Sequence, residues 1–344
     1  MLINRISLFR ALSVALGLHP GICCCPTFAL TMRNLSRFMF LLFLAFLACS
    51  GSASGRTKVS LKDVLSASGI QKIAFSLVQW KFGHGYVVMH EIYAITADDP
   101  SAKLIQAEES SNPAWSPDGS KLAFISFKPG KHSELYVVNT DGSNRIQLTT
   151  SKGGGGVSCT SWSPDGERLA FSAMADKIAK IFVINADGSD QRLVTEGGCP
   201  KWSPDGKQLA FSRYEASTKA QRTRVWITNV DGSDARALTE DKIDSIAPDW
   251  LPDGRGVIFA SNWGGRARLM IYSSDVAGTV RLIKKSDKYD LSYPSLSPDG
   301  KVLVCQVSKE RELPSVAVFR LEGTDIKPVF VANGGIQPSV LWKR

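Results

Sequence analysis

Short apolar runs separated by polar turns recur along the chain. Residues 112–126 read NPAWSPDGSKLAFIS, and the similar phrases CTSWSPDGERLAFSA and CPKWSPDGKQLAFSR begin at Cys159 and Cys199. In the shared Ser-Pro-Asp-Gly, proline presets the first turn position, aspartate can bond its own backbone, and glycine accepts a positive φ. The apolar runs are too short for helices, so each phrase predicts a tight hairpin of two β-strands.

A second pattern follows about half a repeat later. The segments ELYVVNTDGSNRIQLT, KIFVINADGSDQRLVT and RVWITNVDGSDARALT place Asp141, Asp187 and Asp231 at the start of an Asp-Gly pair, which is the strongest short signal of a hairpin. The proline of the first pattern recurs every 40 to 48 residues, at positions 117, 164, 204, 252 and 298. Such intervals are typical of propeller blades or helical pairs, and the short runs favour blades of four antiparallel strands.

The units can be counted from these signatures. Five begin near Asn112, Cys159, Cys199, Ala247 and Tyr293, and KIAFS and HEIYAITADD, from residues 72 and 90, supply strands two and three of another. GIQPSVLW, from residue 335, looks like a first strand without successors. If it pairs with the amino-terminal strands, the ring closes and no sheet edge stays open.

The alternative is that residues 60–69, SLKDVLSASG, supply the missing first strand, which would leave the carboxyl-terminal strand unexplained. We therefore predict an all-β fold, a six-bladed β-propeller of four-stranded antiparallel blades over residues 71–344, closed by the carboxyl-terminal strand.

The amino-terminal region has the order of a secretory signal. Arg33 and Arg37 precede an apolar run over residues 38–48, which is shorter than the about 20 residues of a membrane-spanning helix. We expect residues 32–50 to be a signal peptide or lipoprotein signal and residues 51–70 to be a linker.

Residues 1–31 lie upstream of this signal, which has its own Met32, so we expect them to come from a start codon placed too early; the alternative is an unusually long signal region. Cys49 ends FLAC, which resembles the lipobox of bacterial lipoproteins. Cys49 is thus a lipidation candidate, and the alternative is simple cleavage around residues 50–54.

Charge and the remaining cysteines change this picture little. The net charge is +9, and four arginines without any acid lie in the first 48 residues, so 37 basic and 32 acidic residues remain in the mature chain. This mild excess suits anionic partners but does not predict nucleic acid binding, and export argues against that role.

Cys305 stands where other repeats have phenylalanine and should be buried. An exported chain permits a disulfide between Cys159 and Cys199, but equivalent positions on neighbouring blades need not lie within bonding range.

The unit WSPDG…LAF…IYVxNxDGS…LT resembles the propeller repeat of TolB, the periplasmic component of the Tol-Pal system of Gram-negative bacteria. The resemblance covers residues 70–344. It implies a periplasmic or outer-membrane-anchored monomer without a cofactor, whose partner is an envelope protein such as the peptidoglycan-associated lipoprotein. TolB also carries an α/β domain between signal and propeller. Only residues 50–69 lie there in this chain, so we expect that domain to be lacking.

The same repeat also resembles the propellers that precede the hydrolase domain of prolyl oligopeptidases. Such a hydrolase needs a Gly-x-Ser-x-Gly elbow, which the chain does not contain. The sequence therefore argues against a serine peptidase.

Most repeated residues have a structural explanation. The recurring tryptophans favour packing between blades over a stacking platform for a ligand; they are Trp115, Trp162, Trp202 and Trp250. The turn aspartates offer one carboxylate each, where calcium takes six to eight oxygens. The histidines lack the spacing of zinc ligands, so we expect no metal site.

Function is better sought where the blades differ. Three residues before each tryptophan position lie residues that should ring one mouth of the central channel, namely Asn112, Cys159, Cys199, Ala247, Tyr293 and Gln337. These are candidates for contact with a ligand or partner, although random variation at a solvated rim would look the same.

The loops between second and third strands should share that face and make it basic, with Lys219, Arg222, Arg266 and Arg268 among their residues. Such a face suits an acidic protein or an anionic wall polymer; the plainer interpretation is a solvated surface. We predict an exported, non-enzymatic, protein-binding scaffold. The alternatives are a propeller enzyme of the lyase or cyclase type and a small-ligand receptor, both using the channel mouth.

Overall fold

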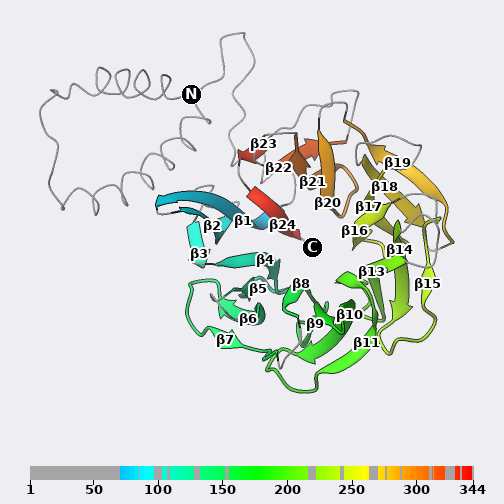
Figure 1. The fold of residues 1–344 in the computed structure, drawn as a ribbon. Coiled ribbons are helices and arrows are strands. Elements are labelled where there is room, and N and C mark those ends of the chain that lie inside the picture. Colours follow the sequence, from blue (N-terminus) through cyan, green and yellow to red (C-terminus); the bar gives the residue numbers. More distant parts are fainter. Residues whose placement is uncertain are drawn as a thin grey trace, which may run out of the picture. The chain divides into compact units, whose positions relative to one another are not determined.

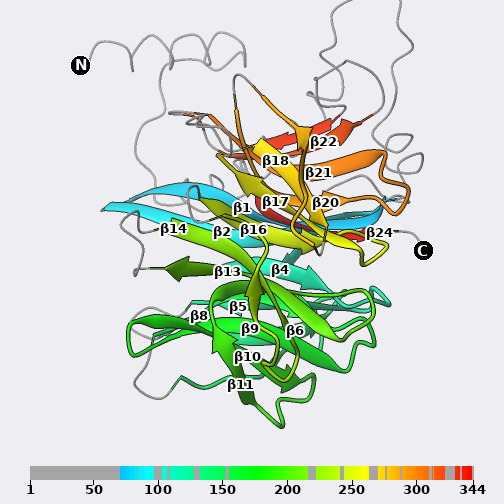
Figure 2. The same ribbon diagram turned by 90° about the vertical axis from the view of Figure 1, so that its right-hand side faces the viewer.

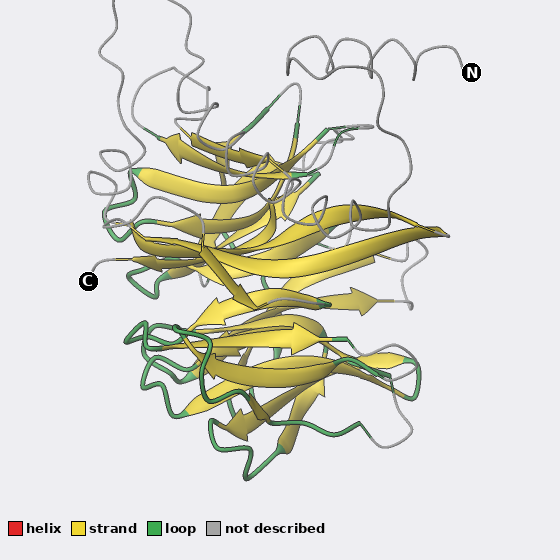
Figure 3. Ribbon diagram, turned by 90° about the vertical axis from the view of Figure 1, so that its left-hand side faces the viewer, coloured by secondary structure: helices red, strands yellow, loops and turns green. Residues whose placement is uncertain are grey.

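The computed structural model describes residues 70–342, except for 84, 97–102, 107–108, 128–131, 152–154, 216–221, 241–243, 263–269, 276, 287–288, 310–311, 313, 322–329 and 334. Within this part, twenty-four strands form six four-stranded antiparallel sheets in a ring (Figure 1). The described residues are strands and loops (Figure 3), and none of them belongs to a helix long and apolar enough to cross a membrane. The predicted signal, Cys49 and the linker up to residue 69 lie outside the described residues.

The prediction of a six-bladed propeller is confirmed. From the channel outward, blade 1 contains β24 (Gly335–Trp342), β1 (Ile70–Gly83), β2 (Gly85–Thr96) and β3 (Lys103–Gln106). Blade 2 contains β4 (Ser110–Trp115), β5 (Lys121–Ser126), β6 (Glu134–Asn139) and β7 (Ile146–Gln147). Blade 3 contains β8 (Val157–Trp162), β9 (Arg168–Ala175), β10 (Ile178–Asn185) and β11 (Arg192–Glu196).

The second half of the ring repeats this order. Blade 4 contains β12 (Gly198–Trp202), β13 (Gln208–Glu215), β14 (Arg222–Asn229) and β15 (Arg236–Ala237). Blade 5 contains β16 (Ser245–Trp250), β17 (Gly256–Ser261), β18 (Met270–Asp275) and β19 (Val280–Lys284). Blade 6 contains β20 (Asp290–Leu296), β21 (Val302–Ser308), β22 (Ser315–Arg320) and β23 (Phe330–Asn333). In the side view the sheets of neighbouring blades lie face to face (Figure 2).

The carboxyl-terminal strand closes the ring, as predicted. β24 pairs antiparallel with β1, with Ile73 opposite Val340 and Ala74 opposite Ser339. Because β24 occupies the innermost place of blade 1, the alternative in which residues 60–69 supply that strand is wrong. Pairing by β24 satisfies the backbone groups along the inner edge of β1, which would otherwise be an open sheet edge.

Apolar side chains fill the spaces between blades. Trp162 of blade 3 is 7% exposed and packs in one cluster with residues of blade 2, and its Nε1 donates to the carbonyl of Ala114, 3.0 Å away. Trp250 of blade 5 donates in the same way to the carbonyl of Lys201 in blade 4, also at 3.0 Å. These contacts confirm that the recurring tryptophan joins neighbouring blades. Cys305 is fully buried, as predicted.

The two repeated turns have the conformations that their residues predict. In the first, Gly119 has a φ of +69°, a conformation that glycine adopts at little cost. Ser116 donates its hydroxyl to Asp118 Oδ1 at 2.6 Å, and the Ser120 amide donates to the same oxygen at 3.0 Å. These bonds lower the pKa of Asp118 to about 2. The carboxylates therefore stabilise turns at the end of the blades that lies opposite the predicted ring.

Candidate functional site

The six predicted ring residues lie at a bulge in the innermost strand of each blade. In blade 2, the register of β4 against β5 shifts between Ser111 and Ala114, and the other innermost strands shift at the same place. In five blades the ring residue has a φ between 50° and 52° and is followed by proline; these are Asn112, Cys199, Ala247, Tyr293 and Gln337. Proline fits here because a bulge already interrupts the ladder of backbone hydrogen bonds.

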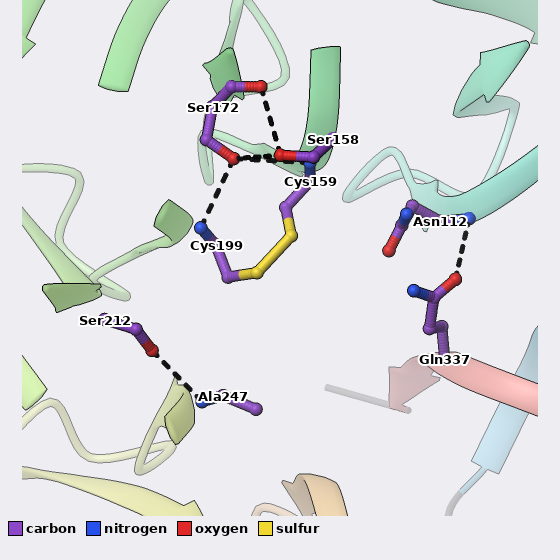
Figure 4. Close-up of a disulfide and its surroundings, with 8 residues drawn as sticks. All are labelled: Asn112, Ser158, Cys159, Ser172, Cys199, Ser212, Ala247 and Gln337. Carbon is purple, nitrogen blue, oxygen red and sulfur yellow. Dashed lines mark hydrogen bonds between the residues drawn. A yellow bond between two sulfur atoms is a disulfide. The ribbon is translucent and has the colours of Figure 1, made fainter. Parts of the chain in front are cut away.

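Side chains of the preceding blade bind the backbone amides of several ring residues. The Ala247 amide donates to Ser212 Oγ at 3.2 Å, and the Gln337 amide donates to Gln306 Oε1 at 3.0 Å. The Cys199 amide donates to Ser172 Oγ at 3.4 Å (Figure 4). The ring is therefore held by contacts between blades as well as by pairing within each sheet.

Blade 3 departs from this arrangement. Cys159 does not adopt the positive φ and is followed by Thr160 instead of proline. At the position of Ser172, Ser212 and Gln306, blade 2 has Ile125. Blade 2 therefore offers no polar side chain at this position to the Cys159 amide. The Cys159 amide donates instead to Ser172 Oγ in its own blade, at 3.3 Å.

A disulfide joins Cys159 to Cys199, with their Cα atoms 4.8 Å apart. This lies within the 4.4–6.8 Å range of bonded cysteines. The sequence left this bond open because the distance between equivalent residues of neighbouring blades depends on how narrow the ring is at that level. The structure shows that the ring is narrow enough at the mouth, and that blades 3 and 4 are covalently linked there (Figure 4).

All six ring residues line one cavity, of about 50 Å³, at the channel mouth. The rest of its lining comes from the next residues of the same strands, namely Pro113, Thr160, Lys201, Pro248, Asp249, Pro294 and Pro338. Pockets that enclose drug-sized ligands have volumes of roughly 300–1,000 Å³, so this cavity is far too small to enclose one. The cavity has room for a few atoms, and a larger partner would have to bind over the channel mouth.

Two charged residues of this lining were missed by the sequence analysis. Lys201 and Asp249 lie two residues after the ring positions of blades 4 and 5. Desolvation raises the pKa of the Asp249 carboxyl, while the Lys201 ammonium, the Trp250 amide and the Ser295 hydroxyl act in the opposite direction. The Trp250 amide donates to Asp249 Oδ1 at 3.0 Å. Aligning this position across the blades would have shown the charges, because blades 2, 3 and 6 have alanine or serine there.

The predicted basic face is described only in part. Of its four residues only Arg222 is described, and its Nη1 lies 3.4 Å from Asp244 Oδ2; Lys219, Arg266 and Arg268 lie outside the described residues. Arg213, from the same pair of strands, lies 3.4 Å from Glu196. Exposed ion pairs contribute little stability, but each cancels a positive charge on this face. Within the described residues, no group of three His, Cys, Asp or Glu could hold a metal ion.

Comparison with known proteins decides the family. The model of the TolB beta propeller domain matches residues 88–199 and 196–340, which together are most of the chain. The chain belongs to this TolB propeller family. The expected resemblance is therefore confirmed across the blades.

Individual relatives agree with the family. The Tol-Pal system protein TolB of Bordetella avium is 33% identical over 122 residues, which are 36% of this chain and 27% of that protein. The chain thus spans about a quarter of the length of that curated relative. The crystal structure of TolB from Acinetobacter baumannii is similar with a TM-score of 0.64 and 20% sequence identity. The matched region covers 81% of this chain and 69% of the Acinetobacter chain.

The propeller fold is shared with an enzyme as well. An oligogalacturonate lyase in complex with manganese has a TM-score of 0.54 at 15% identity, over 76% of this chain and 78% of its own. At that identity the likeness concerns the fold alone.

Proposed function

We propose that this protein is an exported, non-enzymatic propeller that binds an envelope protein over its channel-mouth face. The match to the TolB propeller family over residues 88–199 and 196–340 carries the proposal, because several relatives that share these repeats are named Tol-Pal system proteins. The peptidoglycan-associated lipoprotein is the first candidate partner. We expect the propeller to act as a monomer, periplasmic or anchored through Cys49.

The disulfide supports export. Bonds of this kind form and persist in oxidising compartments such as the periplasm and are rare in the cytosol. The bond between Cys159 and Cys199 lies at the channel mouth, where it holds two blades of the binding face together. It agrees with the signal predicted over residues 32–50.

The mouth supports binding over its surface. Its six ring residues are of five types, while the strands that carry them repeat closely. The cavity of about 50 Å³ leaves little room below this rim. A protein that covers the rim would meet four different side chains in addition to the disulfide, which permits specific recognition.

A photocrosslinker in the ring tests the proposal. p-Benzoylphenylalanine in place of Tyr293 keeps an aromatic side chain at the mouth, and the same residue in place of the exposed Glu167, in a turn at the opposite end of the blades, is the matched control. We expect irradiation of intact cells to link the Tyr293 variant, and not the Glu167 variant, to the peptidoglycan-associated lipoprotein or another envelope protein.

The other results overturn the proposal in distinguishable ways. Crosslinks from Glu167 alone would move the interface to the opposite face. Crosslinks from neither position would favour the alternatives, a small-ligand receptor or an enzyme of the lyase type. In that case Lys201 and Asp249 are the titratable pair at the mouth to test.

A further inference from the structure

Strands β1 and β2 continue past the rest of blade 1 as a two-stranded arm. β24 pairs with β1 only as far as Leu77, and β3 pairs with β2 only as far as Ile92. β1 and β2 stay paired with each other beyond these points, over residues 78–83 and 85–90, which we call the arm. In Figure 2 these two strands reach further from the ring than the other strands on that side.

The arm projects from the end of blade 1 that carries the ring. It begins directly after Leu77, which is opposite Gly335, and Gly335 lies two residues before the ring residue Gln337. β1 is 14 residues long, whereas the second strands of the other blades have six to eight residues. The arm is therefore an extension of one blade toward the side on which the proposed partner binds.

Both edges of the arm lack a paired strand among the described residues. Such an edge presents backbone N–H and C=O groups that can pair with a strand of another protein, and natural proteins commonly guard it with charges or proline. β11 and β19, the five-residue outermost strands of blades 3 and 5, follow this rule with two charged residues each, namely Arg192, Glu196, Arg281 and Lys284.

The β2 edge of the arm has no such guard. Residues 85–90 read GYVVMH and contain no Asp, Glu, Lys, Arg or Pro. Residues 78–83, on the β1 edge, read VQWKFG and contain Lys81. Valine and tyrosine are also residue types that favour strands. Of the two edges, the β2 edge is thus the one suited to accept a further strand.

We propose that an extended segment of the envelope partner pairs as an additional strand with the β2 edge of the arm, over residues 85–90. In this mode of binding, main-chain hydrogen bonds supply affinity and the side chains along the edge supply specificity. The edge offers no Asp, Glu, Lys or Arg as a counter-charge, so the segment that fits it is uncharged and rich in β-branched or aromatic residues. The inference rests on the proposed function, because it assigns the binding mode of that partner.

A lipid surface suits the arm less well. The arm contains Trp80, Phe82 and Tyr86, and tryptophan and tyrosine are enriched at membrane interfaces. Hydrocarbon, however, offers no hydrogen bonds to the backbone groups of two open edges, which makes insertion costly. An added strand satisfies those groups along one edge. A second copy of this chain could also supply a strand, and the experiment separates that case.

Photocrosslinking in intact cells tests the arm. p-Benzoylphenylalanine in place of Tyr86 lies in the β2 edge, and the Tyr293 variant reports on the ring. We expect both variants to link to the same envelope protein. Adding Val87→Lys to the Tyr293 variant should lower its crosslinked product at least about tenfold, because lysine guards an edge against pairing. Val87→Thr, the matched control, keeps a β-branched residue and should retain the product.

The results separate this inference from the proposed function. The inference alone is overturned if Tyr293 links to an envelope protein and Tyr86 does not, or if Val87→Lys leaves the product unchanged. Links from Tyr86 to phospholipid or to a second copy of this chain also overturn it, in favour of that occupant. Crosslinks from neither position overturn both proposals.

Melting of each purified variant checks its fold. If Val87→Lys does not fold, an arm shortened by joining Val78 to His90 through Asn-Gly, which favours a tight hairpin, takes its place. The same loss of the Tyr293 product is expected from the shortened arm, and an unchanged product would overturn the inference.

Discussion

Removing the disulfide is the sharpest test of how the ring is held together. The bond between Cys159 and Cys199 spans 40 residues of sequence, and the loop that it closes contains the four strands of blade 3. In the chain-entropy account, a cross-link over a loop of this length removes freedom from the unfolded chain that is worth about 4 kcal/mol at 25 °C. We therefore expect the double variant Cys159→Ala, Cys199→Ala to lose stability close to that amount.

The loss should appear as a lower melting temperature. For a domain of this size, 1 kcal/mol corresponds to roughly 2–4 °C, so the double variant should melt about 8–16 °C below the oxidised protein. Calorimetry or circular dichroism measures this shift. A reducing agent should lower the melting temperature of the parent protein by a similar amount and leave the double variant unchanged. Melting of all these forms within about 2 °C of one another would refute the idea that the bond constrains the unfolded chain.

Two further predictions concern the repeat itself. Trp162→Phe should lose about 1–3 kcal/mol more stability than Trp202→Phe in urea unfolding, because Trp162 bonds the Ala114 carbonyl while the Trp202 Nε1 has no partner; equal losses would contradict the role of that bond. The pKa of Asp118 is lowered in the folded protein from 3.8 to about 2, so its stabilising contribution is complete above pH 4 and is lost as the pH falls toward 2. Asp118→Asn should therefore flatten the acid side of a plot of melting temperature against pH, and an unchanged slope would contradict this.

The architecture could be predicted from the sequence because the same pattern of strands and turns recurs in several units. Each turn needs only local chemistry, such as the positive φ of Gly119 and the carboxylate of Asp118, so the letters of one turn are enough to identify it. The assignment of β24 to blade 1 followed from counting strands. The carboxyl-terminal segment has the pattern of a first strand, and blade 1 is the blade that lacks one. The six ring positions followed from the same alignment.

The chemistry of the mouth could not be predicted in this way. Aligning the blades marks Lys201 and Asp249 as charges where other blades have alanine or serine, but only the closed ring brings them to the lining of one cavity. Likewise, only the structure shows that the Thr160 hydroxyl is buried without a hydrogen-bond partner. Burial and distance across the ring depend on how all six blades pack, which no single repeat encodes.

The sequence by itself thus determined the strands, the turns, the number of blades and the TolB family, because these depend on short-range patterns repeated in register. The tertiary structure alone decided that Cys159 and Cys199 are bonded and that Lys201 and Asp249 line the same cavity at the channel mouth. Each of these pairs brings together residues that are 40 or more positions apart, at distances that are set by the radius of the closed ring.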